Sequence, residues 1–132
     1  MLARYLHGAA PKIANRRCQG LLCQQFETKG RVVAEISVLH LQFVDTWHRV
    51  NLEPGMIAWR TSATAPAEWE VAEMGWRYPL VDLGAKAGIV GLWLVEYTMT
   101  ATEADARLEF RFEGGRKVII EHKGDCTRLA VI

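Results

Sequence analysis

Residues 41 to 50, LQFVDTWHRV, decide which fold the sequence indicates. Successive side chains of a β-strand point to opposite faces, so a strand here places Phe43 and Trp47 on one apolar face. Asp45 lies between them on that same face, and His48 lies on the other face. A carboxylate in an apolar row is a reactive acid, a turn residue, or a sign that the strand bends.

The apolar face also changes upstream of this stretch. Alternate residues from Val32 to Val38 are apolar, and the apolar positions then move to Leu39, Leu41 and Phe43. A regular strand cannot exchange its faces without an extra residue, so we expect a bulge or sharp bend near residues 37–39. A second irregularity at Val44 and Asp45 would let Asp45 cap a turn.

The N-terminal part of the chain predicts a helix. Pro11 is suited to a first helical turn, and Gly30 is suited to a position just past a helix end. Between them, apolar residues recur at helical spacing, at Ala14, Cys18, Leu21, Leu22 and Phe26. Gly20 within this stripe costs roughly 1 kcal/mol relative to Ala.

The remaining segments predict an antiparallel meander with turns rich in glycine and proline. We expect a turn at 53–55, a hairpin loop at 84–88, and strands at 56–61, 76–83, 89–100, 107–112, 116–122 and 127–132. The strand at 89–100 is apolar on both faces through Val95, which favours a central position. For residues 65–74 we prefer a short helix, although Trp69 and Val71 alternate with glutamates as in a strand.

The turn at 113–115 fixes the register of the last hairpin. A three-residue turn pairs Phe110 with Val118 and Leu108 with Ile120, which gathers the apolar residues on one face. The predicted fold class is therefore α+β: an N-terminal helix packed on a strongly bent antiparallel sheet of six or seven strands. At 132 residues the chain is expected to form a single domain.

Composition excludes several classes of function. The net charge is +1, so no global field attracts nucleic acid or an anionic membrane. No apolar run approaches the roughly 18 residues that span a bilayer. The three cysteines have no zinc-ligand spacing and no disulfide framework, so we expect a cytoplasmic protein without metal or cofactor.

Five tryptophans are the most unusual feature of the composition. Several lie near acids, and aromatic walls with a few carboxylates suit a cationic or amphipathic small molecule. The leading hypothesis is a small-molecule-binding protein that forms a homodimer. Its predicted ligand-binding residues are Trp47, Trp59, Trp93, Tyr97, Glu96 and Asp45.

Two other functions remain open. The same tryptophans would suit a protein-interaction or inhibitory module that uses a Trp-rich face. A small enzyme could use His48 as an acid–base group oriented by Asp45, provided that the chain bends between them. The glycines around Lys86 are not followed by a helix pattern, so they do not predict a phosphate-binding loop.

Overall fold

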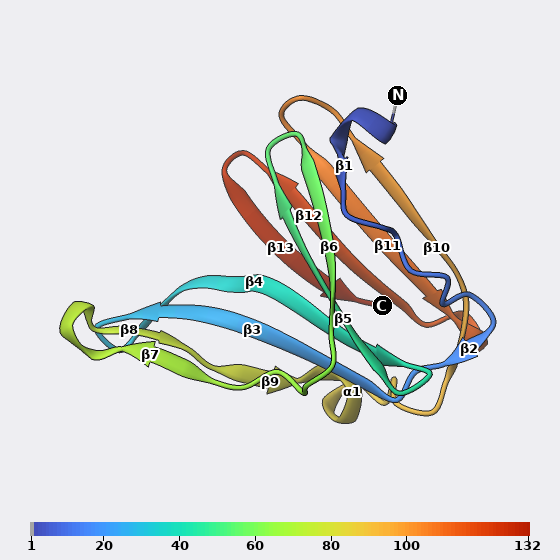
Figure 1. The fold of residues 1–132 in the computed structure, drawn as a ribbon, viewed down its shortest axis with the longest axis horizontal. Helices are drawn as coiled ribbons and strands as arrows, with labels where there is room; N and C mark the ends of the chain where they lie inside the picture. The colour runs from blue at the N-terminus through green and yellow to red at the C-terminus, as the bar shows by residue number, and fades with distance from the viewer. Residues whose placement is uncertain (1) are drawn as a thin grey trace.

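The computed structural model describes residues 2–132, and these residues form two β-sheets that pack face to face (Figure 1). The first sheet has the order β1-β6-β5-β4-β3-β8-β7, with β9 also paired to β3, and only β1 and β6 run parallel. Its strands are β1 (Leu6–His7), β3 (Gly20–Thr28), β4 (Arg31–Phe43), β5 (Thr46–Glu53), β6 (Met56–Ser62), β7 (Trp69–Val71), β8 (Trp76–Tyr78) and β9 (Leu80–Asp82).

The second sheet is an antiparallel meander with one short additional strand at its edge. Its order is β13-β12-β11-β10-β2. The strands are β2 (Arg16–Arg17), β10 (Trp93–Ala101), β11 (Ala106–Phe112), β12 (Lys117–Lys123) and β13 (Cys126–Val131). Over residues 2–132 the helical segments are short: three 3₁₀ turns, η1 (Leu2–Tyr5), η2 (Ala72–Met74) and η3 (Glu113–Gly115), and one α-helical turn, α1 (Leu83–Lys86).

The core lies between the two sheets. We call the covered face of each sheet its inner face and the opposite face its outer face. The inner faces contribute the largest fully buried side chains, among them Leu39, Leu41, Phe43, Val50, Leu94, Leu108, Phe110 and Ile120. Burial of this apolar surface supplies the main driving force for folding.

Part of the first sheet extends beyond the second. The far ends of β3 and β4, together with β7 and β8, form an arm that projects away from strands β10 to β13 (Figure 1). Val32 and Val33 on this arm are 55% and 60% exposed, because no second layer covers them.

The prediction of an α+β class with an N-terminal helix is wrong. Residues 20–28 form β3, which lies between β4 on one side and β8 and β9 on the other. A strand covered on both faces carries a continuous apolar run, which can also match helical spacing, and Gly20 to Cys23 is such a run. Gly20 has a specific reason to lack a side chain: a Cβ there would lie 2.7 Å from Cη2 of Trp47.

The helix predicted at 65–74 is also absent. Residues 65–68 have no regular structure, Trp69–Val71 is strand β7, and only Ala72–Met74 makes a 3₁₀ turn. The alternation of Trp69 and Val71 with Glu70 was therefore the decisive signal, because β7 is an edge strand paired with β8.

Two further expectations need correction. Residues 84–88 do not form a hairpin loop, since Leu83–Lys86 is a helical turn capped by the Asp82 carboxylate, which accepts a hydrogen bond from the Ala85 amide at 3.0 Å. Strand β10 begins only at Trp93, and beyond β10 the sheet holds only the two-residue β2. Its apolar residue Val95 is consequently 43% exposed.

Several register predictions are confirmed. In the β11–β12 hairpin, Phe110 pairs with Val118 and Leu108 with Ile120 around the three-residue turn. The bulge in β4 exists, slightly earlier than expected, because Gln24 pairs with Val38 but Phe26 already pairs with Ala34. Residues 44–45 form a tight turn between β4 and β5, with the backbone φ angles of both Val44 and Asp45 positive.

Within residues 2–132, no helix is long and apolar enough to cross a lipid bilayer.

Candidate functional site

A hollow of about 500 Å³ lies against the outer face of the first sheet. Strands β3 to β6, the segment 64–67 that follows β6, and β7 contribute its lining residues. We call it the tryptophan hollow. It is lined by Gln24, His40, Trp47, His48, Arg49, Arg60, Thr61, Ser62, Thr64, Ala65, Pro66, Ala67 and Trp69.

Two tight turns decide which side chains reach this face. The turn at Val44 and Asp45 pairs His40 with Arg49 and Gln42 with Trp47. The next turn pairs Arg49 with Arg60. Directly opposite residues of an antiparallel pair project from the same face of a sheet, so an imidazole and two guanidinium groups lie in one row.

The amide of Gln19 stabilises the first of these turns. Its Nε2 donates to Oδ1 of Asp45 at 2.9 Å, and its Oε1 accepts a hydrogen bond from the Asp45 backbone N–H at 2.7 Å. Asp45 therefore acts as a turn residue. Asp45 lies in the turn after β4, so the apparent apolar row of Phe43 and Trp47 is divided between two strands, β4 and β5.

A buried network of hydrogen bonds forms the floor of the tryptophan hollow. Gln24 and His40 are only 6% and 8% exposed. Nε2 of Gln24 donates to the backbone carbonyls of Ala67 and Tyr78, each at 3.1 Å, and its Oε1 lies 2.9 Å from Nε2 of His40. Gln24 thus ties the segment 64–67 and the end of β8 to β3.

Burial, and to a smaller extent the neighbouring Arg49 cation, together lower the pKa of His40 to about 4. The imidazole is therefore neutral at pH 7. Burial also lowers the pKa of His48 below its usual value. His48 pairs with the core residue Leu41 and so belongs to the row of the inner face, although it also borders the tryptophan hollow.

Two of the residues that line the tryptophan hollow are tryptophans, Trp47 and Trp69. Trp47 extends across β4 to the space above Gly20. Trp69 stacks on Tyr78 with ring centroids 3.8 Å apart and an interplanar angle of 10°. Trp69 remains 52% exposed, because only one side of its indole is covered by this stacking.

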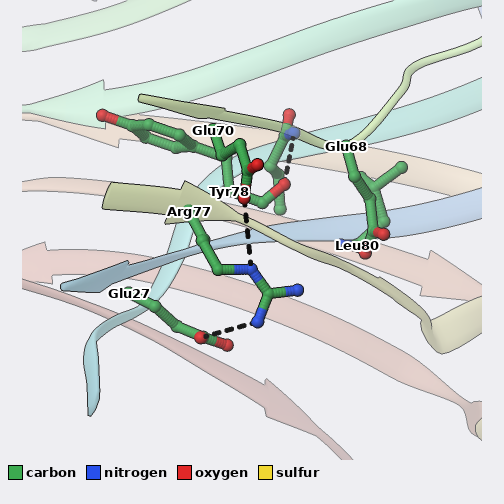
Figure 2. Close-up of polar contacts among 7 residues, drawn as sticks. Glu27, Glu68, Glu70, Arg77, Tyr78 and Leu80 are labelled. Atoms are coloured by element: carbon green, nitrogen blue, oxygen red, sulfur yellow. Dashed lines mark hydrogen bonds and ion pairs between the residues drawn. The ribbon is translucent and has the colours of Figure 1, made fainter. Parts of the chain in front are cut away.

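The acids near Trp69 are engaged by other groups (Figure 2). Glu68 Oε2 accepts a hydrogen bond from the Leu80 amide at 2.8 Å. Arg77 forms ion pairs with Glu27 at 3.6 Å and with Glu70 at 4.0 Å. None of these carboxylates lines the tryptophan hollow, so its charged lining consists of Arg49 and Arg60.

The structure distributes the predicted ligand-binding residues over four places. Trp47 lines the tryptophan hollow, whereas Trp59 and Tyr97 lie between the sheets. The indole N–H of Trp59 donates to Sδ of Met99 at 3.3 Å, and the Tyr97 hydroxyl donates to the Pro11 carbonyl. Both polar groups have protein partners, as expected for aromatic residues of a core.

The other predicted residues lie on the second sheet or at the turn. Trp93 carries the Arg17 guanidinium over its ring at 5.0 Å, and Glu96 pairs with Arg111 at 2.8 Å. Asp45 is bonded to Gln19, and no hydrogen bond between Asp45 and His48 is present. The structure thus brings Trp47 and His48 to one hollow, and it places the two candidate carboxylates elsewhere.

A second hollow of about 690 Å³ adjoins the first, since Arg60 and Thr61 line both. It is bordered by Glu53 and Arg60 and therefore has mixed charge. Among residues 2–132, no group of three or more His, Cys, Asp or Glu side chains is arranged to hold a metal ion.

Sequence reasoning missed most of the tryptophan hollow, namely Gln24, His40, Arg49, Arg60 and Trp69. One signal was present in the chain. Two-residue turns at 44–45 and 54–55 dictate by counting that His40, Arg49 and Arg60 lie in one row. The contribution of the segment 64–67 had no such signal, because residues 65–68 form no regular element.

Comparison with known proteins adds no relative: no family model, no curated protein and no solved structure matches this chain.

Proposed function

We propose that this protein binds a small planar organic anion in the tryptophan hollow. The proposal keeps the class of function that the composition suggests and reverses the expected charge of the ligand. The observation that carries it is the pair of arginines at positions 49 and 60, directly opposed on neighbouring strands.

This pair has no internal counterpart. Among residues 2–132, neither guanidinium forms an ion pair with a carboxylate. Like charges directly opposite each other destabilise a sheet. An anion between Arg49 and Arg60 would remove that repulsion, and a guanidinium can bind a carboxylate through two parallel hydrogen bonds.

The aromatic lining supports a planar ligand. Trp47 and Trp69 both line the hollow, and Trp69 is half exposed while its ring is held by stacking on Tyr78. Rigid indole rings offer a large contact area with little loss of conformational entropy. The volume of about 500 Å³ falls within the range of typical ligand pockets and accommodates one or two fused rings.

The charge of the ligand is tested with two probes of matched shape. We would titrate the full chain with 2-naphthoate and with naphthalen-2-ylmethylammonium by isothermal calorimetry at pH 7. Without a carboxylate in the lining, the cation is expected to bind at least about tenfold more weakly, which corresponds to about 1.4 kcal/mol. Equal binding of the two probes would contradict the proposal.

The position of the anion is tested with arginine variants. Arg49→Gln and Arg60→Gln should each weaken 2-naphthoate binding by about tenfold or more, because a charge-assisted hydrogen bond is lost. Arg31→Gln is the matched control, since Arg31 is an exposed residue of β4 that does not line the hollow. If the control weakens binding as much as the two variants do, the anion site lies elsewhere.

A further inference from the structure

We infer that His40 presents a fixed hydrogen-bond acceptor to the tryptophan hollow, so that the preferred ligand is an aromatic acid that also carries an N–H or O–H donor. This inference rests on the proposed function for its ligand, but its structural premise concerns the free protein alone. The premise is a tautomer of His40 that the surrounding hydrogen bonds leave no freedom to change.

The orientation of the Gln24 amide is the first step. The atom that lies 3.1 Å from the carbonyl oxygens of Ala67 and of Tyr78 must be the NH₂ group, because carbonyl oxygens only accept hydrogen bonds. An inverted amide would place oxygen against two oxygens. The amide oxygen Oε1 is consequently the atom that faces His40.

The tautomer of His40 follows from that orientation. An amide oxygen cannot donate, so the contact of 2.9 Å between it and Nε2 of His40 requires the proton to be on Nε2. The imidazole is neutral at pH 7, because burial and the Arg49 cation oppose a second proton. Nδ1 therefore holds a lone pair and no hydrogen.

That lone pair is free for a ligand. Within residues 2–132, His122 Nε2 is the one fully buried side-chain nitrogen or oxygen that has no hydrogen-bond partner. His40 Nδ1 makes no hydrogen bond to these residues either, so it is not fully buried. It therefore retains contact with the exterior although the residue is only 8% exposed, and the space that His40 borders is the tryptophan hollow. A recessed acceptor without a partner favours a ligand that brings a donor.

The lining thus specifies three features of one molecule. Arg49 and Arg60 select an acid, Trp47 and Trp69 select a flat ring, and His40 selects a donor on or beside that ring. Indole carboxylic acids and hydroxyaryl acids combine these features. A polar site that lacks its partner rejects the corresponding analogue more strongly than an apolar site does.

The ligand test uses indole-3-acetate and benzofuran-3-acetate, which differ mainly in a ring N–H replaced by oxygen. We expect the full chain to bind indole-3-acetate at least about fivefold more tightly by calorimetry, because only the indole donates a hydrogen bond. In His40→Phe, which keeps a ring but lacks the acceptor, the two acids should bind with about equal affinity. Equal affinities of the two acids for the unchanged protein would overturn the inference and leave the anion site standing.

The tautomer is tested without any ligand by the ¹⁵N chemical shifts of the His40 imidazole at pH 7. A protonated Nε2 and an unprotonated Nδ1 are expected, and the Nδ1 resonance should move on addition of indole-3-acetate but not of benzofuran-3-acetate. This measurement uses the unchanged protein, so it remains decisive if His40→Phe does not fold. A proton on Nδ1 in the free protein would overturn the inference whatever the probes do, whereas failure of both acids and of 2-naphthoate to bind would overturn the proposed function as well.

Discussion

The two faces of the β4–β5 hairpin are built from the same ten or so residues and have opposite chemistry. The inner face presents Leu39, Leu41, Phe43 and Val50, each at most 1% exposed. The outer face presents His40, Gln42, Trp47 and Arg49, of which only His40 is buried. The side chains of the inner face stabilise the fold by packing in the core. The polar groups of the outer face lie outside the core, and core packing does not dictate their arrangement.

Trp59 gives the largest expected effect, because its β6 position continues the inner face. It is 3% exposed, and its indole contacts Tyr97 and Phe110 at centroid distances of 5.8 Å and 6.4 Å. Trp59→Ala should lower the free energy of unfolding by about 3–5 kcal/mol, measured by urea denaturation. Trp47→Ala on the outer face should lose only about 1 kcal/mol, since its ring is half-buried and removal leaves a space open to solvent. Equal losses would mean that the two faces do not differ as described.

The second-largest expected effect is a pH dependence of stability that comes from His40 on the outer face. The pKa of His40 is about 4 in the folded protein and near 6.5 in the unfolded chain, so the unfolded chain binds more protons between these values. Stability contributed by His40 is therefore fully present above pH 6.5 and is lost as the pH falls toward 4, by roughly 3 kcal/mol in total.

Urea titrations at pH 7 and pH 4.5 would measure this loss. The comparison is between the unchanged protein and His40→Gln, because the carboxylates and the other histidines titrate in both proteins. The variant is expected to have the shallower dependence on pH. If both proteins lose stability in parallel, the imidazole is not buried in its neutral form.

Gln24 offers a smaller effect on the same face. Gln24→Leu keeps the volume but leaves two carbonyls and Nε2 of His40 without their partner, so we expect a loss of about 2 kcal/mol in the free energy of unfolding. Gln42→Leu is the matched control on β4, because no hydrogen bond of its side chain is present within residues 2–132, and it should change stability by less than about 0.5 kcal/mol. An equally neutral Gln24→Leu would show that the network does not hold the segment 64–67.

The sequence predicted the second sheet better than the first, and the reason is physical. In β11 and β12, apolar and polar residues alternate around a glycine turn, so local pattern and tertiary position agree. In β3, both faces are covered, and the continuous apolar run of Gly20 to Cys23 no longer distinguishes strand from helix. The wrong prediction of an N-terminal helix, and with it of the α+β class, came from that segment.

The candidate site was predictable only in part, for a related reason. Trp47 and His48 were recognised as unusual, but the contribution of Trp69 depends on where an irregular segment runs after β6. The acids that made a cationic ligand attractive, Asp45 and Glu96, are near tryptophans in sequence and bonded to Gln19 and Arg111 in space. Closeness in sequence therefore did not predict contact between an acid and a tryptophan, because successive residues of a strand point to opposite faces of the sheet.

The turn at Val44 and Asp45 determines which residues occupy which face, and it gives the smallest expected effect. Val44 has a φ of +49° and is 60% exposed, an unfavourable conformation for a β-branched residue. Asn adopts positive φ more readily and suits the first position of such a hairpin turn, so Val44→Asn should raise the free energy of unfolding by about 1 kcal/mol in urea denaturation. Val33→Asn is the control, because Val33 is also 60% exposed but has no positive φ, and it should bring no gain. A one-residue slip of β5 would move Trp47 and Arg49 to the core side, so this turn holds the register that places them on the outer face. Val44→Asn stabilises the same register, and it should therefore raise stability while leaving the binding of 2-naphthoate unchanged.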